Sequence, residues 1–101
     1  MHYVVLWSAK ATSDLGEHVA FLCRASASAA SDLTMAILEV GKSLDDYPER
    51  FPAFPMPRSF PHAVRKCVIK KRYIMLYGIC DNTVLIYRIL DARKRFDGLL
   101  E

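Results

Sequence analysis

The sequence contains no apolar run long enough to cross a lipid bilayer. The longest such runs, residues 73–80 and 84–87, fall far short of the roughly 20 residues that a membrane-spanning helix needs. The opening residues, MHYVVLWSAK, also lack the charged start and long apolar stretch of a secretory signal peptide. We therefore expect a cytoplasmic protein with no membrane partner.

Cysteine is scarce, and its spacing excludes the common cysteine-based sites. The chain has three cysteines, Cys23, Cys67 and Cys80, with no C-x-x-C pair, and each lies within an apolar pattern. We therefore expect three buried, reduced thiols and no disulfide. The three histidines have no ligand-like spacing with one another or with the cysteines, so we expect neither a metal site nor a cofactor.

Length and composition leave little room for a second domain or for a disordered tail. A chain of 101 residues is close to the commonest domain size and can bury one modest core. It is 52% hydrophobic and 25% charged, which is typical of a globular protein. We expect one domain spanning residues 1–101.

Positive charge is concentrated in the C-terminal part of the chain. Residues 58–95 contain ten basic and two acidic side chains, a segment charge of +8, whereas the remainder of the chain carries −5. This polarity favours an anionic partner, such as nucleic acid, the ribosome or an acidic protein segment. Lysine and arginine at strand edges also prevent aggregation between sheets, so some of these cations could serve that purpose instead.

The N-terminal half predicts a strand followed by a helical hairpin. Residues 3–7 are β-branched and aromatic, and Ser8 is suited to cap a helix over residues 9–24. Lys10, Asp14 and Glu17 lie outside the apolar stripe of that helix. A second helix, ended by Pro48, has an apolar seam with which it can pack antiparallel on the first. The stripe consists of Ala11, Leu15, Val19 and Leu22, and the seam of Ala30, Leu33, Ile37, Val40, Leu44 and Tyr47.

Residues 48–61 predict an extended crossing loop. This segment, PERFPAFPMPRSFP, contains five prolines and three phenylalanines, so it can form neither a helix nor a central strand. Its FPAFPMP stretch could serve as a ligand for a polyproline-binding domain, but a loop anchored on the protein by its phenylalanines is the stronger interpretation.

Three strands are predicted after this loop, over residues 64–70, 73–80 and 84–90. Asp81-Asn82 is a suitable turn between the last two. The middle strand is apolar on both faces, so we place it in the centre of the sheet, with helices on one face and Tyr73 and Tyr77 on the other. The predicted fold is α+β: an N-terminal strand and an antiparallel two-helix hairpin packed on a mainly antiparallel four-stranded sheet, in the order β-α-α-β-β-β.

An ordered set of features spans nearly the whole chain and resembles a known family. The C-terminal pattern is the most distinctive: RYIMLY over residues 72–77, a turn, and VLIYRILDARK over residues 84–94. The earlier features are Trp7-Ser8, then Ala11, Asp14 and Leu15, then Leu44-x-x-Tyr47-Pro48, and Arg65 at the start of a strand. Together they resemble toxins of the RelE/ParE superfamily of bacterial type II toxin–antitoxin systems.

The resemblance implies growth inhibition and a role in plasmid stabilization. A cognate antitoxin would neutralise the toxin in a hetero-oligomeric complex. The partly disordered C-terminal segment of the antitoxin would fold along the toxin, with acidic side chains on the cations and apolar ones in the groove of the helical hairpin.

Two mechanisms occur in this superfamily. Members resembling RelE promote mRNA cleavage in the ribosomal A site, where cations stabilise charge on the phosphate and a side chain moves a proton. Members resembling ParE act on DNA gyrase and have no known nuclease chemistry. The RelE pattern would place arginines at Ile74 and Arg93 and a tyrosine at Leu99, and only Arg93 matches. Many relatives have a histidine where this chain has Asp91.

We therefore favour ParE-like inhibition of DNA gyrase without enzymatic activity. The alternative is a RelE-like, ribosome-dependent mRNA interferase. A third hypothesis is a non-toxic, basic nucleic-acid-binding module, although the glycine–aromatic signature of an RNA recognition motif is missing.

The candidate site residues follow from the charge pattern and the resemblance. Lys70, Lys71 and Arg72 are expected to meet carboxylates or phosphates, with a solvated turn as the other interpretation. A nuclease would use Arg93, Arg72, Lys71 and Tyr77, with Tyr73 or Tyr87 as further proton-transfer groups; a tyrosine titrates near about pH 10 and would need activation. The predicted contact residues for the target or the antitoxin are Arg65, Lys70, Lys71, Arg72, Arg88, Arg93, Lys94, Arg95 and Phe96.

Overall fold

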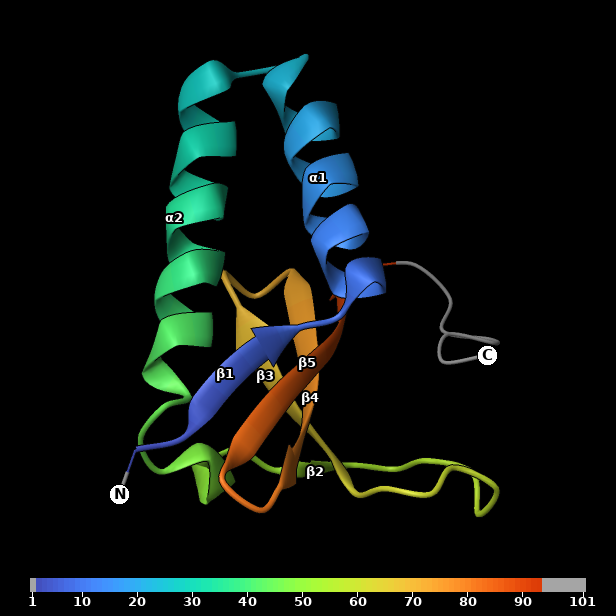
Figure 1. The fold of residues 1–101 in the computed structure, drawn as a ribbon. Coiled ribbons are helices and arrows are strands. Elements are labelled where there is room, and N and C mark those ends of the chain that lie inside the picture. Colours follow the sequence, from blue (N-terminus) through green and yellow to red (C-terminus); the bar gives the residue numbers. More distant parts are fainter. Residues whose placement is uncertain (1, 94–101) are drawn as a thin grey trace.

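A helical hairpin stands on one face of a five-stranded sheet in the computed structural model, which describes residues 2–93 (Figure 1). The predicted α+β fold and its order of strands and helices are confirmed. The elements are β1 (Val4–Trp7), α1 (Ala9–Cys23), α2 (Ala27–Ser43), the 3₁₀ helix η1 (Pro48–Arg50), β2 (Ala53–Phe54), β3 (Val64–Ile69), β4 (Tyr73–Cys80) and β5 (Thr83–Asp91). No helix within the described part is both long and apolar enough to span a bilayer.

The sheet has the strand order β1-β5-β4-β3-β2, so β4 is its central strand, as predicted. β1 pairs parallel with β5, and the other neighbours are antiparallel. The sheet has one strand more than predicted, because two residues of the proline-rich segment, Ala53 and Phe54, pair with Arg65 and Val64. Two residues among prolines carry no strand periodicity, and such a short edge strand cannot be read from the sequence.

Both helices begin at a serine cap. The Ser8 hydroxyl accepts a hydrogen bond from the backbone N–H of Ala11 (3.0 Å), as predicted, and donates one to the carbonyl of Tyr87 on β5 (2.8 Å). Ser26 caps α2 by accepting from Ala29 (3.1 Å). Ser8 therefore fixes the start of α1 both along the helix and against the sheet.

The larger core lies between the helices and the sheet. Leu33 and Ile37 of α2 pack there with Tyr73, Met75 and Tyr77 of β4. The prediction that these tyrosines face away from the helices is therefore wrong. Every residue from 73 to 78 is buried, so the pattern could not reveal which face of β4 meets the helices.

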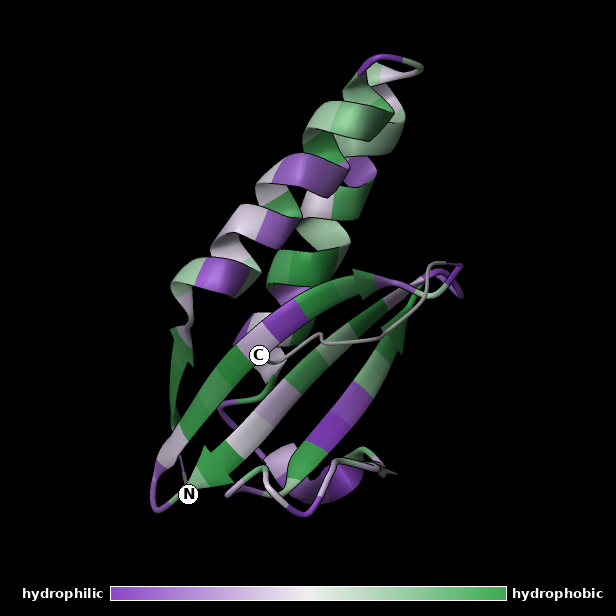
Figure 2. Cartoon of the chain, turned by 90° about the vertical axis from the view of Figure 1, so that its right-hand side faces the viewer, coloured by the Kyte–Doolittle hydropathy of each residue, from purple (hydrophilic) through white to green (hydrophobic). Residues whose placement is uncertain are grey.

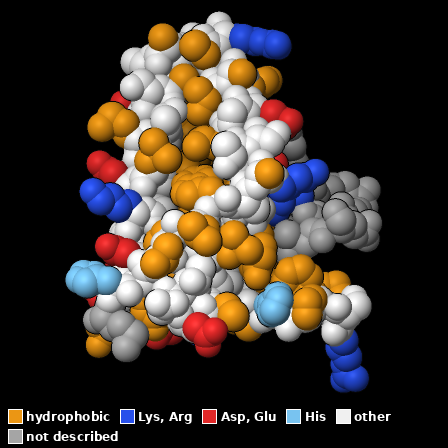
Figure 3. Space-filling view, viewed as in Figure 1, with side chains coloured by type: hydrophobic (Ala, Val, Ile, Leu, Met, Phe, Trp, Pro, Cys, Tyr) orange, Lys and Arg blue, Asp and Glu red, His pale blue; other side chains and the backbone are white. Residues whose placement is uncertain are grey.

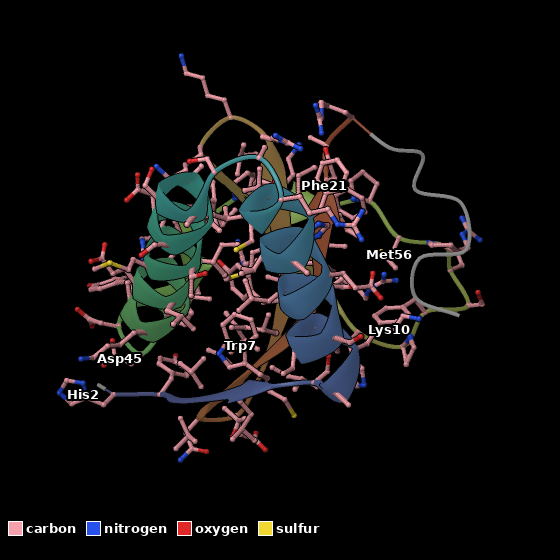
Figure 4. All side chains as sticks on the ribbon, turned by 90° about the horizontal axis from the view of Figure 1, so that it is seen from above. His2, Trp7, Lys10, Phe21, Asp45 and Met56 are labelled. Carbon is pink, nitrogen blue, oxygen red and sulfur yellow. The ribbon has the colours of Figure 1, made fainter. Side chains whose placement is uncertain are left out.

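Trp7 joins β1 to this core. Its side chain points from β1 into the space between α1 and α2 (Figure 4). It lies so close to α2 that a Cβ atom at Gly41 would be 3.0 Å from the indole. In the view of Figure 3, hydrophobic side chains gather between the two helices and charged ones lie along the margins.

The opposite face of the sheet has its own smaller core. Val64, Ile74, Leu76 and Leu90 are buried there beneath Phe54, Met56, Phe60 and Tyr87. The proline-rich segment is thus anchored on the sheet by its phenylalanines, as predicted, and the strands are apolar along most of their length (Figure 2). A Cβ at Gly78 would lie 2.9 Å from the Tyr87 ring, so a glycine at this position gives that ring its room.

Three predictions about burial are wrong. Tyr47, predicted to lie on the helical seam, follows the end of α2 and is 75% exposed with φ 47°. The residue before a proline is disfavoured in the helical region, which ends the helix earlier than the apolar spacing indicates. Cys23 and Cys80, the last residues of α1 and β4, are exposed, and only Cys67 is buried. Burial raises the pKa of the Cys67 thiol.

The backbone of β5 extends beyond its pairing with β1, which ends at Ile86. From there, α1 satisfies the strand edge with side chains. The Asp14 carboxylate accepts from the Ile89 N–H (3.0 Å), and Nε2 of His18, one helical turn later, lies 2.8 Å from the Ile89 carbonyl. A buried edge left unpaired would be strongly destabilising, so α1 substitutes here for a neighbouring strand.

Asp14 also binds Arg88, and the two form a largely buried ion pair. Arg88 Nε lies 2.7 Å from Asp14 Oδ2, and Nη2 lies 3.0 Å from Oδ1. The two side chains are only 16% and 10% exposed. Asp14, which the helical pattern placed outside the apolar stripe, is thus a buried residue that joins α1 to β5.

Replacement of Asp14 should strongly destabilise the protein. Asp14→Ala leaves the Arg88 guanidinium and the Ile89 N–H without this partner, and we expect a loss of about 3 kcal/mol in the free energy of unfolding. Asp14→Asn, which retains an acceptor for Ile89, should lose less. Urea unfolding measures both, with exposed Asp32→Ala on α2 as the control. A change below about 0.5 kcal/mol for Asp14→Ala, the range of ordinary surface substitutions, would contradict this role.

Candidate functional site

Two lysines form the tip of the β3–β4 turn. Lys70 and Lys71 both have positive φ, 53° and 59°, and the Arg72 N–H donates to the Ile69 carbonyl (3.2 Å). Positive φ at both central residues is the type I′ arrangement, which asparagine and glycine adopt far more readily than lysine. Turn chemistry therefore does not account for these exposed lysines, and backbone strain of this kind is common at functional sites.

Asp91, the last residue of β5, gathers two arginines next to this turn. Its Oδ1 accepts from the Arg93 N–H (3.0 Å) and Nε (3.2 Å), and its Oδ2 accepts from Arg93 Nη2 (3.1 Å). Arg72 Nη2 lies 3.6 Å from the same Oδ2. The Ala92 N–H donates to the Arg72 carbonyl (2.6 Å), so the turn and the end of β5 are joined through the backbone as well.

The Asp91 carboxylate is held ionised. The side-chain hydrogen bond from Arg93 is the main cause that lowers the pKa of Asp91, to about 2, against the opposing effect of burial. The Arg93 backbone N–H and the positive charges of Arg93 and Arg72 act in the same lowering direction. One carboxylate is thus shared by two guanidinium groups, and a net positive charge remains beside Lys70 and Lys71.

A small hollow opens beside these charges. It has a volume of about 250 Å³. It is lined by Glu17, His18, Phe21, Arg72, Tyr73, Asp91 and Arg93. Phe21 is 61% exposed and lies on the side of α1 nearest the end of β5 (Figure 4).

The Arg72 side chain is held over the Tyr73 ring, with its guanidinium carbon 5.1 Å from the ring centre. Its Nε is buried and has no hydrogen-bond partner among the described residues. We name Lys70, Lys71, Arg72 and Arg93 the cationic end of the sheet.

Arg65 and Arg88, also predicted to contact a partner, make polar contacts within the protein. Arg65 Nη1 donates to the carbonyls of Glu49 (3.0 Å) and Phe51 (2.7 Å), so it fastens the segment after α2 to β3. Arg88 is paired with Asp14. A count of cations along the sequence cannot separate such arginines from exposed ones. Lys94, Arg95, Phe96 and Leu99 lie outside the described residues.

Tyr77 is placed unfavourably for proton transfer. It is fully buried, and its hydroxyl donates to the carbonyl of Pro48. Burial is the main cause that raises the pKa of Tyr77, to about 12. Ile74, at the position where the RelE pattern has an arginine, lies in the smaller core. Burial also raises the pKa of Tyr87, and Tyr73 is buried beneath Arg72 and beside His18.

Sequence reasoning gave Glu17, His18 and Phe21 no place in a site. The helical spacing contained a signal for Phe21, because a large aromatic side chain outside the apolar stripe of α1 is a candidate for exposure. No local signal places His18 or Glu17 beside residues 72–93, since only the packing of α1 on β5 brings them there. Among residues 2–93, no three His, Cys, Asp or Glu side chains are placed to hold a metal ion.

The fold is shared with a protein of known structure. It is similar to a chain in the structure of the chromosomal ParDE toxin–antitoxin system from P. aeruginosa, with a TM-score of 0.73 and 18% sequence identity. The match covers 89% of this chain and 96% of the other, and at that identity it shows a shared fold.

A family model described as the ParE toxin of the type II toxin–antitoxin system parDE matches residues 5–96. The chain therefore belongs to the ParE toxin family. No curated protein matches the sequence. The resemblance to RelE/ParE toxins is thus confirmed, on the ParE side of the superfamily.

The ionised state of Asp91 predicts a specific acid sensitivity. Because the pKa of Asp91 is lower in the folded protein than its ordinary value of 3.8, its carboxylate stabilises the fold above that pH. This stabilisation is lost as the pH falls through about 2. We expect the free energy of unfolding to decrease more steeply between about pH 4 and pH 2 in the wild type than in Asp91→Asn. Urea unfolding at several pH values gives the two slopes, and equal slopes would contradict the assignment.

Proposed function

We propose that this protein is the toxin of a type II toxin–antitoxin module and arrests growth by inhibiting DNA gyrase. The observation that carries the proposal is the cationic end of the sheet, which exposes charge next to an exposed aromatic side chain, Phe21. Guanidinium groups beside an aromatic anchor are typical of binding hot spots on large protein partners. Such a surface acts by binding and needs no proton-transfer group.

A cognate antitoxin is the second partner in this proposal. Carboxylates of an acidic antitoxin segment would pair with Lys70, Lys71 and Arg93 and so cover the surface that meets the target. The helical hairpin would take the apolar side chains of the same segment, since Met35 and Leu38 of α2 are exposed apolar residues. The antitoxin and the target would thus compete for the same surface of the toxin.

A ribosome-dependent mRNA interferase is the second candidate function. Arg72 and Arg93 beside Lys71 could hold a phosphate, which favours it. The tyrosines weigh against it, because Tyr77 is buried with a raised pKa and Tyr73 lies beneath Arg72. The third hypothesis, a base-stacking module, needs exposed aromatic rings on the sheet, whereas Tyr73 and Tyr77 are core residues.

Purified protein, freed from its antitoxin, tests the proposal in two parallel assays. We expect inhibition of DNA supercoiling by gyrase, and no cleavage of mRNA on translating ribosomes. Arg93→Ala should weaken the inhibition roughly tenfold, because it removes a charged contact. Because Arg93 is the main hydrogen-bond partner of the buried Asp91 carboxylate, the variant should also be less stable, so inhibition is compared at equal concentrations of folded protein.

Arg58→Ala, an exposed arginine in the crossing loop, is the matched control and should retain full inhibition. Ribosome-dependent cleavage of mRNA with unaffected gyrase would replace the proposed function by the second candidate. Equal inhibition by Arg93→Ala and Arg58→Ala would contradict the assigned surface.

A further inference from the structure

The acidic residue at the centre of the cationic end is itself hidden. The Asp91 side chain is 4% exposed, whereas the Arg93 side chain bound to it is 62% exposed and that of Arg72 is 29% exposed. A buried carboxylate therefore holds two partly exposed guanidinium groups from below. Their positions relative to each other depend on this one side chain.

Asp91 also directs the backbone. The bond from the Arg93 N–H to Asp91 Oδ1 closes a local turn directly after β5, and the fork of Nε and Nη2 on the two carboxylate oxygens fixes the direction of the Arg93 side chain. Arg72 reaches the same Oδ2 from the β3–β4 turn. Two segments distant in sequence thus meet on a single carboxylate.

Charge alone does not explain an acid at this position. A carboxylate beside Arg72 and Arg93 lowers the positive potential of the surface and should weaken its attraction for an anion. Besides stabilising the fold, the carboxylate has a geometric effect: an arginine fixed before binding loses less side-chain freedom when the partner arrives. The Arg93 side chain is 62% exposed, so its remaining guanidinium N–H groups stay available for the partner.

We infer that Asp91 is a positioning residue. It holds Arg72 and Arg93 side by side as a preformed double-guanidinium site for an acidic side chain of the target protein. This inference rests on the proposed function, in which the cationic end is the contact surface. It assigns a task to a residue that makes no contact with the partner itself.

Asp91→Asn separates positioning from charge, because the two predict opposite signs. The substitution removes a negative charge, so a surface that needed only charge would bind an anionic partner more tightly. Loss of positioning instead weakens activity, and we expect growth inhibition in inducible cells to require roughly tenfold more soluble toxin. The matched control is Asp81→Asn in the exposed β4–β5 turn, which makes the same charge change at a positive φ that asparagine tolerates. It should leave growth inhibition unchanged.

Two further measurements keep the result interpretable. Asp91→Glu retains the charge but displaces the carboxylate by one methylene, so it should also weaken growth inhibition. If Asp91→Asn does not fold, Asp91→Glu tests the positioning role in its place. Side-chain NMR spectra of the wild type should show slowly exchanging Nε–H signals for Arg93, which Asp91→Asn should lose.

A double-mutant cycle with Arg93→Ala tests whether Asp91 acts through Arg93. If Asp91 acts through Arg93, then Asp91→Asn should add much less loss in the Arg93→Ala background than in the wild type. Full or increased growth inhibition by Asp91→Asn, with Arg93→Ala impaired, would overturn the positioning role and leave the proposed function intact. Full growth inhibition by both Arg72→Ala and Arg93→Ala would instead show that the proposed contact surface is wrong, and the inference would fall with it.

Discussion

The structure depends on how hydrogen-bond partners are supplied to the edge of β5 beyond its pairing with β1. β1 pairs with β5 only as far as Ile86, and the register shift in the β4–β5 ladder leaves Tyr87 without a partner on β4. The cap of α1 and two side chains of the helix supply what a longer strand would have given: Ser8 bonds to the carbonyl of Tyr87, and Asp14 and His18 bond to the two backbone groups of Ile89. This contact fixes α1 over the sheet, and it thereby brings Phe21 beside the end of β5.

Two carboxylates place arginines of the C-terminal half in different surroundings. Asp14 binds Arg88 in a largely buried ion pair that joins α1 to β5. Asp91, three residues further along β5 than Arg88, is itself buried but holds Arg93 and Arg72 where solvent and a partner can reach them. The same ion-pair chemistry thus has opposite outcomes, because α1 covers β5 at Arg88 and leaves the strand end open at Arg93.

Periodic features could be predicted from the sequence, and pairings distant along the chain could not. The cap at Ser8, the central place of β4 and the turn at Asp81 follow from local patterns and are confirmed. The burial of Asp14 could not be foreseen, because its partner Arg88 lies 74 residues away. The facing of Tyr77 was also undetermined, since a strand apolar on both faces has no polar side to orient it. Net charge located the cationic segment, but only the fold separates Arg65 and Arg88 from Lys70, Lys71 and Arg93.

We propose that the cationic end of the sheet, and not the general positive charge of the protein, carries the growth-inhibiting activity. A charge reversal at the tip of the β3–β4 turn, Lys71→Glu, tests this most directly against the same reversal at exposed Lys10 on α1. We compare the amount of soluble protein that halves the growth rate in inducible cells. We expect Lys71→Glu to need roughly tenfold more protein than the wild type, and Lys10→Glu to need the same amount as the wild type. Equal potency of the two variants would contradict it.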